Sequence, residues 1–225
     1  ELREPGDFPR PAPDAGKIKE AAAILVGARN PLIWAGGGVN SSGANEALLR
    51  LTEHLQAPVI ATAEGRGAIS DRHHLSLGAL RLRNDPIAKD YPKFDVILAV
   101  GTRMAFPAYL DGQQVVQIDI DPAELGRNYE NTFGIQADAR LGLEELHREV
   151  ASLTPARASR QPEIDQIKAN RAATALRVEP QDSYLAAIRA AMPEDGILIS
   201  GMTQLGYYSR AYYPVYQPKS FITSS

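Results

Sequence analysis

The sequence contains no cysteine, and this absence excludes several kinds of chemistry at once. Disulfide bonds, zinc sites with thiolate ligands and cysteine nucleophiles all need that residue. Long apolar runs are missing as well, since no stretch approaches the roughly 20 residues that a helix needs to cross a bilayer. No positively charged segment followed by an apolar one opens the chain. We therefore expect a cytoplasmic protein that has no membrane partner.

The charge of the chain does not indicate a nucleic-acid partner either. The 225 residues carry a formal net charge of −3 and lack the clustered basic stripe of nucleic-acid-binding proteins. Two adjacent histidines, His73 and His74, cannot easily face one ion, and no third ligand follows them at a suitable spacing. No metal site is therefore predicted in this chain.

Apolar strands alternate with amphipathic helices over the first two thirds of the chain. Strands are predicted at 31–35, 58–62, 95–101, 114–121 and 133–137, and helices at 17–28, 42–55 and 139–150. Because the strands are apolar throughout, we expect burial on both faces, as in a parallel sheet covered by helices. The alternation predicts an α/β fold with an open, doubly wound parallel sheet of the Rossmann-like type.

The composition along the chain predicts four segments. The predicted boundaries are 1–16 for a proline-rich arm, 17–151 for the central domain, 152–180 for a linker and helix, and 181–225 for the start of a second α/β unit. The chain starts without methionine and ends on a β-prone stretch, so we expect an excised piece whose partner is the remainder of its parent chain. Five tyrosines between positions 207 and 216 favour a contact surface with that remainder.

Ligands of open α/β sheets bind beyond the carboxyl ends of the strands, so the residues that follow each strand are the candidate site. Glycines allow the backbone to approach a phosphate, arginines suit a diphosphate, and carboxylates suit ribose hydroxyls or an adenine amine. The candidates of these types are Gly36, Gly37, Gly38, Thr62, Gly65, Arg66, Arg103, Asp119 and Asp138. The same residue types also form turns and helix caps, so a structural role for these loops stays open.

Five segments in combination resemble the central domain of acetolactate synthases, which are thiamine-diphosphate-dependent enzymes. They occur in the expected order at residues 34–42, 62–67, 75–78, 100–103 and 117–124. Residues 181–225 resemble the opening of the diphosphate-binding domain of the same family.

The resemblance implies a parent enzyme that binds thiamine diphosphate and Mg²⁺ between its other domains and decarboxylates or joins 2-oxo acids. It also implies a homo-oligomer, and a fragment that is inactive alone, because the family's activating glutamate and metal motif lie elsewhere. The central domain of true acetolactate synthases holds FAD in a non-redox role. Its FAD contacts map onto Gly38, Thr62, Gly65, Arg103, Asp119 and Asp138.

One departure from the family pattern concerns which nucleotide the central domain would bind. The loop that runs along the flavin has two glycines in the family, but here it reads Arg81-Leu82-Arg83-Asn84. Arg81 and Arg83 favour a phosphate-bearing ligand such as ADP or a coenzyme A moiety over FAD, and an empty site is the other outcome. Two further hypotheses stay open: a free-standing nucleotide-binding or flavin-binding module, and a scaffold that only joins the catalytic domains.

Overall fold

A six-stranded parallel sheet forms the centre of the molecule. The computed structural model describes residues 9–80, 91–105, 112–175 and 177–223. The sheet has the order β3-β2-β1-β4-β5-β6. Its strands are β1 (Pro31–Ala35), β2 (Val59–Ala61), β3 (Ser76–Ala79), β4 (Val96–Val100), β5 (Gln114–Asp119) and β6 (Thr132–Gln136). Because the order runs outwards in both directions from β1 and β4, the predicted open, doubly wound α/β sheet is confirmed.

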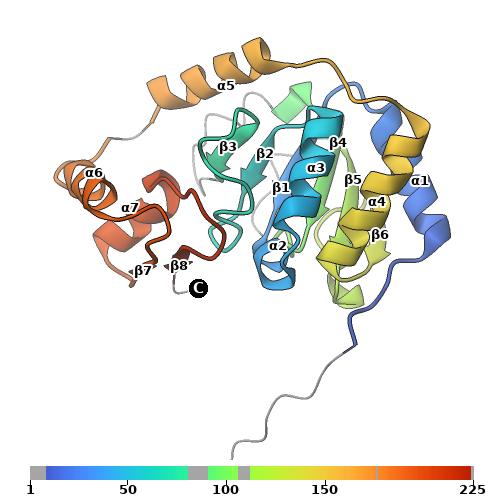
Figure 1. The fold of residues 1–225 in the computed structure, drawn as a ribbon, viewed down its shortest axis with the longest axis horizontal. Coiled ribbons are helices and arrows are strands. Elements are labelled where there is room, and N and C mark those ends of the chain that lie inside the picture. The colour runs from blue at the N-terminus through green and yellow to red at the C-terminus, as the bar shows by residue number, and fades with distance from the viewer. Residues whose placement is uncertain (1–8, 81–90, 106–111, 176, 224–225) are drawn as a thin grey trace, which may run out of the picture.

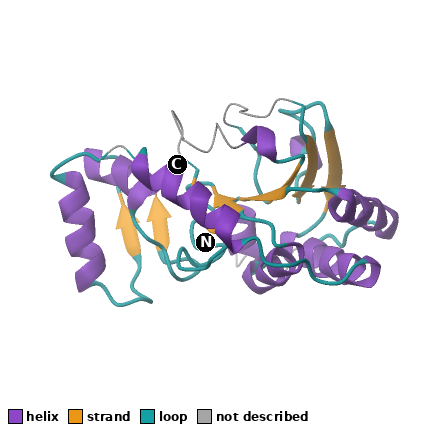
Figure 2. Ribbon diagram, turned by 90° about the horizontal axis from the view of Figure 1, so that it is seen from above, coloured by secondary structure: helices purple, strands orange, loops and turns teal. Residues whose placement is uncertain are grey.

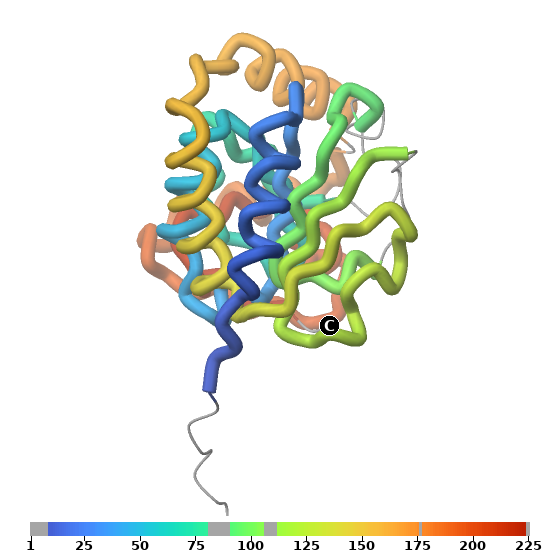
Figure 3. Tube along the Cα trace, turned by 90° about the vertical axis from the view of Figure 1, so that its right-hand side faces the viewer, coloured from blue at the N-terminus to red at the C-terminus, as the bar shows by residue number. Residues whose placement is uncertain are grey.

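Helices cover both faces of this sheet. One face carries α1 (Ala15–Gly27), α3 (Asn45–Leu55) and α4 (Ala139–Leu153), and α1 and α4 run side by side (Figures 1 and 3). The opposite face receives α5 (Gln161–Ala173), which packs through Ile164 and Ile167. Short 3₁₀ helices lie at Tyr91–Lys93 and Pro122–Glu124. No helix within the described ranges is long and apolar enough to cross a membrane.

The side chains of each strand point alternately to the two faces of the sheet, and both faces are covered, which explains why the strands are apolar throughout. In β1, Ile33 and Ala35 belong to the core under α1, α3 and α4. Leu32 and Trp34 belong to the core on the α5 side. Successive strand residues point to opposite faces, so covering both faces requires apolar residues at every position.

A second, smaller unit follows α5. It contains α6 (Gln181–Ala191), β7 (Leu198–Ser200), α7 (Gln204–Tyr212) and β8 (Phe221–Thr223). The two strands pair in parallel, with Ile199 opposite Ile222. Figure 2 shows this unit beside the six-stranded sheet. The unit has its own core of five buried residues, Leu185, Tyr208, Tyr213, Val215 and Phe221. Whether its limits are those of a domain stays a prediction.

Several elements differ from the sequence predictions. Residues 76–79, for which no strand was predicted, form the edge strand β3, because four residues with Gly78 at φ +72° carry too little periodicity to be recognised. The glycine loop after β1 is in fact the short helix α2 (Gly37–Ser42), which ends at Gly43 in the left-handed conformation. Helix α7 was not predicted, whereas β8 lies in the terminal stretch that the sequence indicated as β-prone.

The tyrosines near the chain end were expected to form a contact surface together. The structure instead buries Tyr208 and Tyr213 in the core of the second unit, whereas Tyr207 is 51% exposed. Neighbouring residues of an amphipathic helix point in different directions. Tyr208 of α7 is therefore buried while the adjacent Tyr207 is exposed.

Candidate functional site

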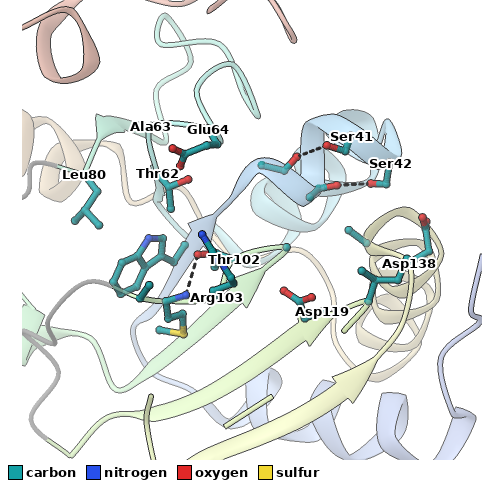
Figure 4. Close-up of a pocket in the computed structure, with 18 of the residues that line it drawn as sticks. Ser41, Ser42, Thr62, Ala63, Glu64, Leu80, Thr102, Arg103, Asp119 and Asp138 are labelled. Carbon is teal, nitrogen blue, oxygen red and sulfur yellow. Dashed lines mark hydrogen bonds between the residues drawn. The ribbon is translucent and has the colours of Figure 1, made fainter. Parts of the chain in front are cut away.

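A cavity of about 870 Å³ opens at the carboxyl ends of the strands, where β1 and β4 lie side by side. This is the point at which the strand order reverses, and open α/β sheets bind ligands there. Figure 4 shows Leu80, Thr62 and Glu64 on one side of the cavity and Asp119 and Asp138 on the other. Among the described residues the lining is formed by Arg10, Trp34, Gly37, Gly38, Ser41, Ser42, Thr62, Ala63, Glu64, Leu80, Gly101, Thr102, Arg103, Met104, Ala105, Asp119, Ile120, Asp138, Ala139 and Arg210.

Most of the residues predicted from the sequence meet in this cavity. The residues that do so are Gly37, Gly38, Thr62, Arg103, Asp119 and Asp138. Gly36 and Gly65 are not part of the lining, and Arg81 lies outside the described residues. The roles assigned to these residues stay predictions.

Three of the predicted glycines approach protein backbone closely. A Cβ atom on Gly36 would lie 2.2 Å from the carbonyl oxygen of Gly101. One on Gly65 would lie 2.2 Å from the carbonyl oxygen of Ala35, and one on Gly38 would lie 2.6 Å from the Cα of Gly101. The loops after β1, β2 and β4 therefore touch through their backbones. Packing of these loops accounts for Gly36 and Gly65, while Gly37 and Gly38 also form cavity wall.

The end of the cavity near β3 is apolar. Trp34, Leu80, Met104 and Ala105 contribute to it, and none of them was singled out in the sequence. Trp34 is only 2% exposed, and its Nε1 atom has no hydrogen-bond acceptor among the described residues. Met104 has φ +49°, and its backbone N–H donates to Oγ1 of Thr102 at 3.1 Å. This bond lies within the loop after β4 that lines the cavity (Figure 4).

Asp138 is already engaged within the protein. Its carboxylate caps α4 by accepting from the backbone nitrogens of Arg140 at 3.0 Å and Leu141 at 3.2 Å. It also pairs with Arg10 at 3.4 Å, and Arg10 donates to the carbonyl oxygen of Ser42 at 2.8 Å. The predicted ribose contact at Asp138 would therefore compete with a helix cap.

Asp119, at the end of β5, is the less committed carboxylate. It is 8% exposed and accepts a hydrogen bond from the backbone nitrogen of Asp121 at 3.0 Å. Burial raises the pKa of Asp119, and that hydrogen bond only partly opposes the rise. A carboxylate with unused acceptor capacity at a cavity wall suits a hydroxyl or amine donor from a ligand.

Replacing Asp119 with asparagine is expected to stabilise the unliganded protein at neutral pH. The folded pKa of Asp119 lies above its unfolded value, so deprotonation disfavours the folded state. The cost is absent below the unfolded pKa and grows as the pH rises through the folded pKa. Urea unfolding from pH 3 to pH 8 should show that the free energy of unfolding of the variant increases relative to that of the wild type as the pH rises. A difference that does not vary with pH would contradict this reading.

Two arginines at the cavity have no carboxylate partner among the residues that the structure describes. Neither Arg103 nor Arg210 forms an ion pair in the part of the chain that the structure describes. Arg210 comes from α7 of the second unit and was not foreseen. Arg66, which the sequence suggested for a diphosphate, is 2% exposed and lies outside the lining.

The chain is similar in sequence to several known proteins. The family described as thiamine pyrophosphate enzyme, central domain, matches residues 18–146. A probable acetolactate synthase large subunit of Methanococcus aeolicus is 37% identical over 141 residues, which are 60% of this chain and 24% of that protein. A probable 2-ketoarginine decarboxylase, AruI, of Pseudomonas aeruginosa is 32% identical over 231 residues, covering 98% of this chain and 39% of that protein.

A solved structure shows a similar fold. It is that of a putative thiamin diphosphate-dependent enzyme from Mycobacterium smegmatis, with a TM-score of 0.74 at 20% sequence identity. The similarity covers 100% of this chain and 44% of that one. This chain thus spans from 24% to 39% of the length of the curated relatives above.

Proposed function

This chain belongs to the thiamine pyrophosphate enzymes through their central domain, and from that premise we propose that it serves an acetolactate synthase-like 2-oxo acid decarboxylase or carboligase. In that parent, thiamine diphosphate would supply the electron sink for decarboxylation or carbon–carbon bond formation. We assign the cofactor and Mg²⁺ to the other domains of the parent, so this chain alone is expected to be inactive. Its partners would be the remainder of the parent and further copies in a homo-oligomer.

The alignment with the decarboxylase supports 2-oxo acid decarboxylation as the reaction of the parent. That relative matches 98% of this chain, including the second unit, whereas the match to the archaeal acetolactate synthase covers 60%.

For the chain itself we propose a binding site for an adenosine diphosphate unit, which ADP and FAD share. The observation that carries this proposal is the cavity at the reversal of strand order, with Arg103 and Asp119 on its walls. A volume of about 870 Å³ falls in the range of small-molecule sites. Arg103 would pair with a phosphate and Asp119 would accept from ribose hydroxyls or the adenine amine. The apolar wall at Trp34 would pack against a ring.

Calorimetric titration of the chain with ADP, FAD and thiamine diphosphate plus Mg²⁺ tests this proposal. We expect saturable binding of ADP, and a dissociation constant about tenfold or more higher for Arg103→Ala, because a charge-assisted hydrogen bond is lost. The matched control is Arg148→Ala, which removes an arginine on α4 outside the cavity. If neither ADP nor FAD binds, the cavity is not a nucleotide site and the scaffold hypothesis replaces it. Tight binding of thiamine diphosphate would contradict the assignment of that cofactor to other domains.

A further inference from the structure

We propose that Arg210 is a phosphate-binding residue contributed to the cavity by the second unit, and that a bound nucleotide therefore fastens the two units together. The inference rests on the proposed nucleotide site, and it adds a residue and a coupling that the family match over 18–146 does not include.

A hydrogen bond and an aromatic ring orient the guanidinium of Arg210. Its Nε atom donates to Oγ1 of Thr223 on β8 at 2.8 Å. The guanidinium lies 5.4 Å from the ring centroid of Tyr207. No ion pair to Arg210 occurs among the residues that the structure describes, although Arg210 is one of the residues that line the cavity. An arginine held at Nε still presents its two terminal nitrogens, which match two oxygens of a phosphate.

A buried ion pair joins the backbone next to Arg210 to the six-stranded unit. Arg66 donates from Nη1 to the carbonyl oxygen of Arg210 at 2.9 Å, and from Nη2 to that of Tyr213. Nη2 also pairs with Oδ2 of Asp71 at 2.6 Å. Asp71 in turn exchanges two bonds with the backbone of Val215, at 2.8 and 2.9 Å. The end of α7 is thus attached to the segment after β2.

That segment also forms cavity wall. Thr62, Ala63 and Glu64 line the cavity a few residues before Arg66. A ligand that touches Arg103 in the loop after β4 and Arg210 on α7 would join the same two units that Arg66 joins. Because a ligand stabilises the arrangement to which it binds, occupancy should favour the docked position of α7.

Titration with ADP, AMP and adenosine separates the phosphate contact from the rest of the site. Arg210→Gln is expected to raise the dissociation constant for ADP about tenfold or more and to leave that for adenosine within about twofold. The control Arg177→Gln removes an arginine that pairs with Asp182 of α6 and lies outside the cavity, and it should change neither value. An equal loss for ADP and adenosine, or no loss for ADP, would overturn the role of Arg210 while leaving nucleotide binding intact. If the wild type binds no ADP, both proposals fail.

Hydrogen exchange tests the coupling independently. ADP should slow amide exchange over Gln204–Tyr212 in the wild type and in Arg177→Gln, but not in Arg210→Gln at matched saturation. Protection of these amides that persists in Arg210→Gln would show that the nucleotide does not act through this residue.

Discussion

Replacing Arg66 with alanine is expected to lower the free energy of unfolding by about 3–5 kcal/mol, because it breaks a buried ion pair. Arg66 is 2% exposed, and its partner Asp71, whose side chain is 16% exposed, would be left without a counter-charge. Two carbonyl oxygens, those of Arg210 and Tyr213, would also lose their donor. Urea unfolding followed by circular dichroism measures the loss. The broken contacts hold the second unit. The substitution should therefore accelerate amide exchange more in that unit than in the six-stranded sheet.

The matched control is an arginine whose ion pair lies at the surface. Arg50 pairs with Glu46 on α3 at 2.6 Å, and both side chains are well exposed. Arg50→Ala should cost no more than about 0.5 kcal/mol, as is usual for exposed pairs one helical turn apart. If Arg66→Ala were as mild as Arg50→Ala, the second unit would be held by other contacts.

Replacing Gly36 with alanine is expected to lower the free energy of unfolding by about 3 kcal/mol, the upper end for overpacking. The new methyl group would lie 2.2 Å from the carbonyl oxygen of Gly101 and 2.5 Å from Cβ of Thr102. Backbone cannot give way as a flexible side chain can, so the loops after β1 and β4 must separate. The same loops line the cavity, and affinity for ADP should fall along with the urea midpoint.

Gly27 provides the control for this substitution. It is the last residue of α1, and a Cβ atom there would meet nothing within 4 Å. Gly27→Ala should therefore be neutral or stabilise the protein by up to about 1 kcal/mol. A Gly36→Ala protein as stable as the Gly27→Ala protein would show that the loops can move apart at little cost.

The order in which strands and helices alternate made most of the fold predictable. Strand β4 was evident from five successive apolar residues, Val96–Val100, because a strand covered on both faces must be apolar throughout. Strand β3 escaped prediction because an edge strand of four residues with a glycine at positive φ has neither length nor pattern. The short helix α2 escaped for a similar reason, since two glycines at its start indicate a loop rather than a helix.

The candidate site was predicted less completely. Residues that follow strands, such as Thr62, Arg103 and Asp119, could be collected from the sequence, because parallel strands all end at one edge of the sheet. Trp34 could not be predicted as a cavity residue from the sequence, because it lies inside a strand and its apolar neighbours suggest only a core position. Arg210 could not be predicted as a cavity residue because it comes from a different unit.

The sequence by itself determined the fold class and the family of this protein, since both depend on local patterns: apolar strands, helix stripes and loop residues in a given order. Only the tertiary structure decided how the arginines are used. Arg66 follows β2 as a phosphate ligand would, yet it bonds to backbone 144 and 147 residues away. Arg210 has no local feature of a ligand, yet it lines the cavity. Contacts between residues so distant in sequence depend on the packing of whole units, which no local pattern encodes.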